Sequence, residues 1–219
     1  MISQMSIVPD RDVSFSPVIR IAAKIISYIF HPLFVPLYIG LFFIYEIRLF
    51  NDRTDWQQKI ILAQFFIYYT FFPLMTTVLS KALGFIQTVY LKTQRDRIIP
   101  YIVCEIFYFW AWYVFKNLHF PKEGVMFALG VFLSCSLGLI LNSFMKISMH
   151  TISLGVMCTF FLLAATITAN KYGIYIAIAF FIAGITATAR LIDSNHTQRE
   201  IYLGFFAGAF AEVIAYFFA

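Results

Sequence analysis

Charged residues are scarce in this sequence of 219 residues. Asp, Glu, Lys and Arg together make up 12% of it, whereas 61% is hydrophobic and 27 residues are phenylalanine. The mean hydropathy is +0.81. A soluble domain of this composition would have too few polar side chains to cover its surface, so the scarcity of charge excludes that class of protein. The sequence therefore predicts an all-α polytopic membrane protein.

Cysteine is also scarce. The three cysteines, Cys104, Cys135 and Cys158, all lie inside apolar runs. We therefore expect neither a disulfide nor a cysteine metal site, and we interpret the three side chains as small buried residues.

Long apolar runs, in contrast, are abundant, and several reach the roughly 20 residues that a helix needs to cross a bilayer. We expect residues 1–24 to form a polar tail and residues 25–219 to form one transmembrane helical domain. Prolines in the first two runs predict kinks there. His31, within the first run, has two interpretations, a functional side chain or a structural one that is hydrogen-bonded to a neighbour, and we prefer the second. The runs predict about seven transmembrane helices: Ile25–Ile47, Ile60–Ser80, Ile98–Phe115, Gly124–Leu141, Thr151–Ala169, Tyr172–Ala189 and Ile201–Phe218.

Three polar segments separate these runs, at residues 92–100, 146–150 and 190–200. They follow the second, fourth and sixth predicted helices. Because successive loops alternate between the two sides of the membrane, all three segments must share one side, which we call the motif face. The candidate site residues that they gather there are Lys92, Arg95, Arg97, Lys146, Ser148, His150, Arg190, His196 and Glu200.

Cations clustered at a membrane interface suit a phosphate group. Arginine binds phosphate oxygens in pairs, and lysine adds a point charge. Two histidines beside such a cluster indicate phosphoryl transfer, in which one attacks phosphorus and the other protonates the leaving oxygen. A metal site is disfavoured, because the neighbouring cations would repel a divalent ion. No cofactor is expected.

The interval between His196 and Glu200 allows two interpretations. If the last helix begins at or before His196, both side chains share one face of it, and the Glu200 carboxylate would accept a hydrogen bond from the far nitrogen of the imidazole. Alternatively, Thr197 and Glu200 form a capping box at the start of the last helix. The spacing favours neither. Ser148 is equally open, since its hydroxyl could bind phosphate or cap the following helix.

Parts of the three segments resemble the motifs of the type 2 phosphatidic acid phosphatase superfamily, KXXXXXXRP, PSGH and SRXXXXXHXXXD. Arg190, His196 and Glu200 have the spacing of the third motif, with Glu in place of Asp. Ser148 and His150 match the second motif. The resemblance implies a six-helix core, preceded here by one N-terminal helix.

The first motif is the most divergent. Lys92 and Pro100 are present, but Ile99 stands where the family has arginine, so we expect Arg97 or Arg95 to replace it. The other departures are Ala189 for Ser, Ile147 for Pro and Met149 for Gly.

The resemblance also implies an activity and the roles of the residues. The protein is expected to hydrolyse a lipid phosphomonoester or pyrophosphate without a metal. His196 is the expected nucleophile, which forms a phosphohistidine, and Glu200 orients it. His150 is the expected general acid, which then activates water. The expected phosphate ligands are Arg190, Ser148, Lys92 and Arg97 or Arg95, with Lys146 beside them.

Two alternatives use the same residues. One is a phosphotransferase that passes the phosphoryl group to a lipid or sugar hydroxyl. The other is a binding or transport protein that has lost the chemistry, which the departures at Ile99, Ile147 and Met149 motivate.

The expected partners are the lipid bilayer and a membrane lipid phosphate. The net charge of +5 suits lipid headgroups better than nucleic acid. The oligomeric state is left open. The resemblance favours a bacterial inner-membrane protein whose site faces the periplasm, although the motif face holds more Lys and Arg, which alone favours the cytoplasm.

Overall fold

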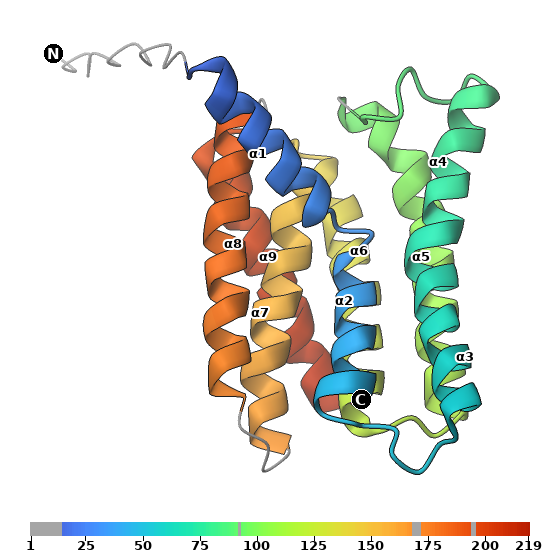
Figure 1. The fold of residues 1–219 in the computed structure, drawn as a ribbon. Coiled ribbons are helices and arrows are strands. Elements are labelled where there is room, and N and C mark those ends of the chain that lie inside the picture. The colour runs from blue at the N-terminus through green and yellow to red at the C-terminus, as the bar shows by residue number, and fades with distance from the viewer. Residues whose placement is uncertain (1–14, 92, 168–171, 194–195) are drawn as a thin grey trace, which may run out of the picture.

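The computed structural model describes residues 15–91, 93–167, 172–193 and 196–219. Within these ranges the chain is helical and contains no strand. Six of its helices are long and apolar enough to cross a membrane, so the chain is an all-α polytopic membrane protein, as predicted. The first of them, Asp55–Ala82, consists of α3 (Asp55–Phe66), the π-helical turn η2 and α4 (Phe72–Ala82). The others are α5 (Gln94–Asn117), α6 (Lys122–Asn142), α7 (Met149–Ile167), α8 (Gly173–Asp193) and α9 (Gln198–Phe218) (Figure 1).

The structure corrects the first predicted span, which is two helices instead of one. α1 (Pro17–Ile29) and α2 (Val35–Leu41) are separated by residues 30–34, and α2 continues as a π-helical turn, η1 (Phe42–Glu46). Pro32 lies in this break, where its ring removes a hydrogen-bond donor and disfavours helix at the residue before it. The sequence predicted only a kink here.

α1 also begins earlier than the first predicted span. The Ser16 hydroxyl accepts a hydrogen bond from the backbone N–H of Ile19, and Pro17 occupies the first helical position. Residues 17–24, which the sequence assigns to a polar tail, are therefore helical, and they belong to a helix that packs along α8. Residues 1–14 of the predicted tail lie outside the described residues.

The break between α1 and α2 lies inside the depth of the bundle, well below the upper ends of α4 and α8 (Figure 1). Its carbonyl groups find donors within the protein. The Thr70 hydroxyl donates to the Leu33 carbonyl at 2.7 Å, and the Tyr38 hydroxyl donates to the Ile29 carbonyl at 2.8 Å. The bundle thus satisfies backbone groups that lipid could not.

Pro73 affects the second predicted span differently. A proline here cannot donate to the carbonyl of Tyr69, and its ring would collide with that carbonyl in a regular α-helix. The π-helical turn η2 (Ile67–Phe71) ends two residues before Pro73, and the Phe72 N–H donates a hydrogen bond to the Ile67 carbonyl. The wider turn accommodates the proline, so the helix continues as one span of 28 residues.

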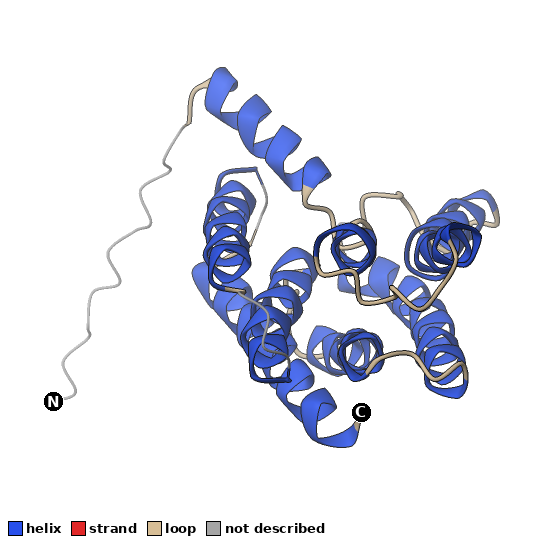
Figure 2. Ribbon diagram, turned by 60° about the horizontal axis from the view of Figure 1, so that its bottom comes forward, coloured by secondary structure: helices blue, strands red, loops and turns tan. Residues whose placement is uncertain are grey.

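Glycines let α7 and α9 cross at close range. A Cβ atom added to Gly155 of α7 would lie 2.0 Å from the Phe205 carbonyl oxygen, and one added to Gly208 of α9 would lie 2.0 Å from that of Ile152. The spacing of small residues in the last span predicted such packing. α9 also packs on α6, and Figure 2 shows the long helices side by side, with the N-terminal helix along one edge.

The ends of these helices bring the three polar segments together. The Gln94 side chain donates to the Asn142 carbonyl at 2.7 Å, which joins the start of α5 to the end of α6. The Ser148 N–H donates to the Glu200 carbonyl at 3.4 Å, which joins the start of α7 to the start of α9. The motif face is therefore one continuous surface, in agreement with the alternation of the loops.

Candidate functional site

A cavity of about 700 Å³ extends from the motif face into the bundle. Its charged end is built from α5, the α6–α7 loop, α7, α8 and the α8–α9 loop. Five of the predicted site residues line it there: Arg97, Lys146, His150, Arg190 and His196.

The rest of the cavity is mainly apolar. Its walls include Pro73, Leu74 and Val78 of α4, together with Phe127 and Val131 of α6. A cavity with cations at one end and apolar side chains along its length suits a ligand with an anionic head and a hydrocarbon body.

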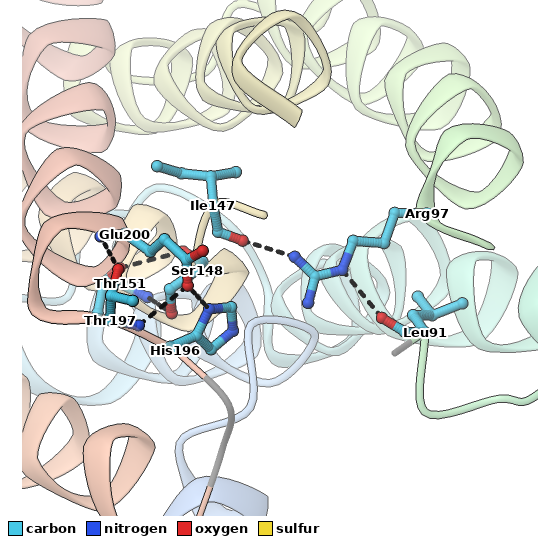
Figure 3. A network of polar contacts seen from close by, with 8 residues as sticks. All are labelled: Leu91, Arg97, Ile147, Ser148, Thr151, His196, Thr197 and Glu200. Atoms are coloured by element: carbon cyan, nitrogen blue, oxygen red, sulfur yellow. Dashed lines mark hydrogen bonds and ion pairs between the residues drawn. The ribbon is translucent and has the colours of Figure 1, made fainter. Parts of the chain in front are cut away.

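His196 is buried directly before α9, with its Nδ1 atom 2.9 Å from Oε2 of Glu200 (Figure 3). A carboxylate can only accept, so Nδ1 carries the proton and Nε2 has the free lone pair. The same carboxylate oxygen accepts from the Thr197 N–H at 3.0 Å, and the Thr197 hydroxyl accepts from the Glu200 N–H at 3.3 Å. The capping box and the contact between Glu200 and His196 are therefore both present. His196 lies before the helix, however, so the two side chains do not share a helix face as one interpretation required.

The surroundings of His196 keep its imidazole neutral. Burial lowers the pKa of His196 to about 4, against the opposing effect of the hydrogen bond with Glu200. The charges of Arg97, Arg190 and Lys146 lower this pKa further. At neutral pH the Nε2 lone pair is therefore available, as a nucleophile requires.

Arg97 is buried in the first turn of α5, and two backbone carbonyls hold its guanidinium (Figure 3). Nε donates to Leu91 at 2.9 Å, and Nη1 donates to Ile147 at 2.6 Å. Leu91 has a φ of 49°, which is uncommon for leucine and places its carbonyl within reach of Arg97. No described residue accepts a hydrogen bond from Nη2, which leaves that group for a ligand.

Positive charge exceeds negative charge at this end of the cavity. Arg190 comes from the last turn of α8, and Lys146 from the loop before α7. Burial lowers the pKa of Lys146, and the neighbouring Arg97 lowers it further. The acids nearby are Glu200 and Asp193. An anion bound here would relieve the repulsion among the three cations.

His150 lies in the first turn of α7, where its Nε2 is 3.1 Å from the Ser27 carbonyl oxygen of α1. A carbonyl only accepts, so Nε2 carries the proton and Nδ1 is the free nitrogen. The ring stands edge-on to that of His31, with centroids 5.1 Å apart and an interplanar angle of 83°. The N-terminal segment thus sets the orientation of a predicted catalytic side chain.

Two predicted ligands, Ser148 and Arg95, are not part of the cavity lining. Ser148 is fully buried, and its hydroxyl accepts from the Thr151 N–H at 3.5 Å, which is the helix-capping alternative. Arg95 is exposed to solvent and does not line the cavity, so the geometry favours Arg97 of the two arginines. Lys92 lies outside the described residues.

The N-terminal segment also lines the cavity, which the three polar segments alone did not predict. His31 and Lys24 both line the cavity, and the Lys24 ammonium lies 3.9 Å from Asp193 at the end of α8. The sequence feature that could have indicated this contribution is a histidine next to a proline inside an apolar run.

No family model matches this sequence, and neither a curated protein nor a solved structure matches it. Among the described residues, no three His, Cys, Asp or Glu side chains form a group that could hold a metal ion.

Proposed function

We propose that this protein hydrolyses a phosphate ester or pyrophosphate of a membrane lipid through a phosphohistidine, without a metal. The observation that carries the proposal is the pair of His196 and Glu200 at the charged end of the cavity. The Nε2 atom of His196 has a free lone pair, and His196 lines the cavity together with Arg97, Arg190 and Lys146.

In the first step, the Nε2 lone pair of His196 attacks phosphorus, and the bond from phosphorus to the leaving oxygen breaks. His150, protonated at Nδ1, gives its proton to that oxygen, while its Nε2–H stays on the Ser27 carbonyl. The cations stabilise the charge on the equatorial oxygens. The hydrogen bond with Glu200 stabilises the positive charge that develops on His196.

In the second step, water attacks the phosphohistidine. His150 takes one proton from the water through Nδ1, the new bond from oxygen to phosphorus forms, and the bond from phosphorus to Nε2 breaks. Inorganic phosphate leaves, and His196 returns to its neutral form.

The apolar part of the cavity supports a lipid as the substrate. A phosphate at the charged end would leave its hydrocarbon body beside α4 and α6. We place the protein in a bacterial inner membrane with the motif face toward the periplasm, an assignment that rests on the resemblance of the motifs.

Phosphate release by the purified protein in detergent tests this proposal. We expect release from a panel of phosphatidic acid, phosphatidylglycerol phosphate and undecaprenyl pyrophosphate, undiminished by EDTA. Glycerol phosphate, which lacks the hydrocarbon body, should be a much poorer substrate. Complete dependence on Mg²⁺ would contradict the mechanism. Lipid binding without any release would favour the alternative of a binding or transport protein.

The two arginines of α5 provide a matched pair of variants. We expect Arg97→Ala to lower kcat/KM by about 100-fold, since one charged donor to phosphate contributes roughly 1.5–3 kcal/mol. Arg95→Ala, two residues earlier on the exposed side of the helix, should change kcat/KM by no more than about twofold. Equal losses of kcat/KM in the two variants would show that the substrate responds to general surface charge and that Arg97 is not a specific phosphate ligand.

A further inference from the structure

His31 belongs to the segment that the six long helices do not include, yet it lines the same cavity as His196. We infer that His31 donates a hydrogen bond from Nε2 to the bound phosphate, so that the break between α1 and α2 completes the site. The inference rests on the proposed function, because it assigns a further ligand to the same phosphate.

The backbone of the break fixes the protonation of His31. The Leu33 N–H donates to its Nδ1 atom at 3.3 Å. An N–H needs a lone pair to receive it, so Nδ1 carries no proton and Nε2 carries the only one. The imidazole of His31 is therefore a neutral donor.

The same contact sets the direction of this donor. Nδ1 faces the backbone of its own segment, so Nε2, on the far side of the ring, points away from it. No described residue accepts a hydrogen bond from Nε2. The ring is largely enclosed between Phe34 and His150, and Arg190 acts on it electrostatically from α8. A phosphate oxygen at the charged end of the cavity would give this hydrogen a partner.

The position of the break supports a binding role. Non-helical backbone at the depth of a membrane is costly and is tolerated where it is buried in protein or lines a cavity. Broken helices in membrane proteins commonly supply ligand-binding groups for this reason. Here His31 lies two residues after the end of α1, and its neighbours Pro32 and Leu33 line the cavity with it.

Two conservative variants separate binding from a purely structural role. The amide of asparagine takes about the place of Nδ1, and that of glutamine about the place of Nε2. His31→Asn therefore keeps an acceptor for the Leu33 N–H but loses the donor to phosphate, whereas His31→Gln keeps the donor. We expect His31→Asn to lower kcat/KM about 10- to 100-fold and His31→Gln to retain most of it.

Inhibition by inorganic phosphate gives a second readout. Its inhibition constant should rise in His31→Asn by a factor similar to the loss in kcat/KM, and it should change little in His31→Gln. Tyr38→Phe controls for loosening of the segment, since it removes only the hydrogen bond to Ile29. We expect it to change kcat/KM by about twofold at most.

The results have distinct meanings. Wild-type activity in His31→Asn, or equal losses in the asparagine and glutamine variants, would overturn the role of His31. If the wild-type protein releases no phosphate from any lipid, the proposed function fails. In that case, phosphorus NMR of inorganic phosphate binding tests whether His31 is a phosphate ligand. Weaker binding in His31→Asn than in the wild-type protein supports this role, and no binding to the wild-type protein overturns it.

Discussion

Replacing His196 with asparagine is expected to abolish phosphate release, with a loss on the order of 10⁴-fold or more, as removal of a catalytic nucleophile does elsewhere. The asparagine amide takes about the place of Nδ1, so it can still donate to Glu200 and leave the start of α9 intact. Nε2, the proposed attacking atom, is lost. The variant thus removes the proposed nucleophile and keeps the local fold.

Binding should survive this substitution, because Arg97, Arg190 and Lys146 remain. We therefore expect His196→Asn to bind inorganic phosphate with nearly the affinity of the wild-type protein while turnover disappears. Phosphate release and phosphorus NMR measure the two quantities on the same preparation.

His119→Asn is the matched control. His119 lies in the loop between α5 and α6, away from the motif face, and its φ of 52° is one that asparagine tolerates well. This variant should have wild-type activity. Removal of a nucleophile should cost far more than about 100-fold in turnover. If His196→Asn retained more than about one per cent of wild-type turnover, a phosphohistidine at this position would be ruled out.

The second large effect concerns the fold. We expect Gly208→Ala to destabilise the protein by about 3 kcal/mol, at the upper end of the range for overpacking, because the added methyl group meets the backbone of α7 and no movable side chain. For a chain of this size, that corresponds to a fall in melting temperature of roughly 6–12 °C. Thermal unfolding in detergent measures it.

Gly155→Ala should have a similar effect, since its Cβ would meet the carbonyl oxygen of Phe205 in α9. The double variant should lose less than the sum of the single variants, because one separation of α7 from α9 relieves both collisions. The control is Gly184→Ala on α8, where an added Cβ has no neighbour within 4 Å. That variant should be neutral or slightly stabilising. Equal melting temperatures for Gly208→Ala and Gly184→Ala would contradict the close crossing.

The crossing also connects stability with activity. A Cβ atom added to Gly204 would lie 2.4 Å from the Thr151 hydroxyl oxygen and 2.9 Å from the Ser148 carbonyl oxygen. The contact between α7 and α9 therefore extends to the motif face, where these helices begin beside His150 and His196. Helices that separate here would also separate the proposed acid from the proposed nucleophile.

The long helices were predictable because an uninterrupted apolar run has few alternatives to crossing the membrane. The ends of these helices were less predictable. Arg97 and Arg190 lie in the terminal turns of α5 and α8, although their charge suggested loops. A charged residue lowers the hydropathy of a segment, so the predicted spans end before such residues. Hydropathy contains no information about a cavity into which a charged side chain can point.

The first span shows what the sequence does not specify. Pro32 predicts an interruption, but whether the chain bends or breaks depends on donors elsewhere that satisfy the freed carbonyls. Thr70, which bonds to Leu33, is 37 residues away in the sequence. Such pairings become visible only once the helices are packed.

Much of the site could be anticipated from spacing. The interval from His196 to Glu200 predicted a contact that the structure contains, although His196 precedes α9 and the capping box at Thr197 positions the carboxylate. The choice between Arg95 and Arg97 could not be made, since residues two apart point in nearly opposite directions and only packing decides which faces inward. His31 was interpreted as structural because its ring partner, His150, follows it by more than a hundred residues, so the sequence did not connect it with the site.

The break between α1 and α2 has an electrical consequence. It lies below the upper ends of helices that cross the membrane, and the cavity that it lines continues deeper, to Phe127 and Val131. A phosphate that reaches His31 has therefore entered part of the transmembrane field, which acts on each elementary charge with about 2.3 kcal/mol per 100 mV for a full crossing. A membrane that is negative inside opposes the entry of an anion from its outer side and favours it from its inner side. The sign of the voltage dependence of turnover in energised vesicles thus reports the side that the motif face occupies.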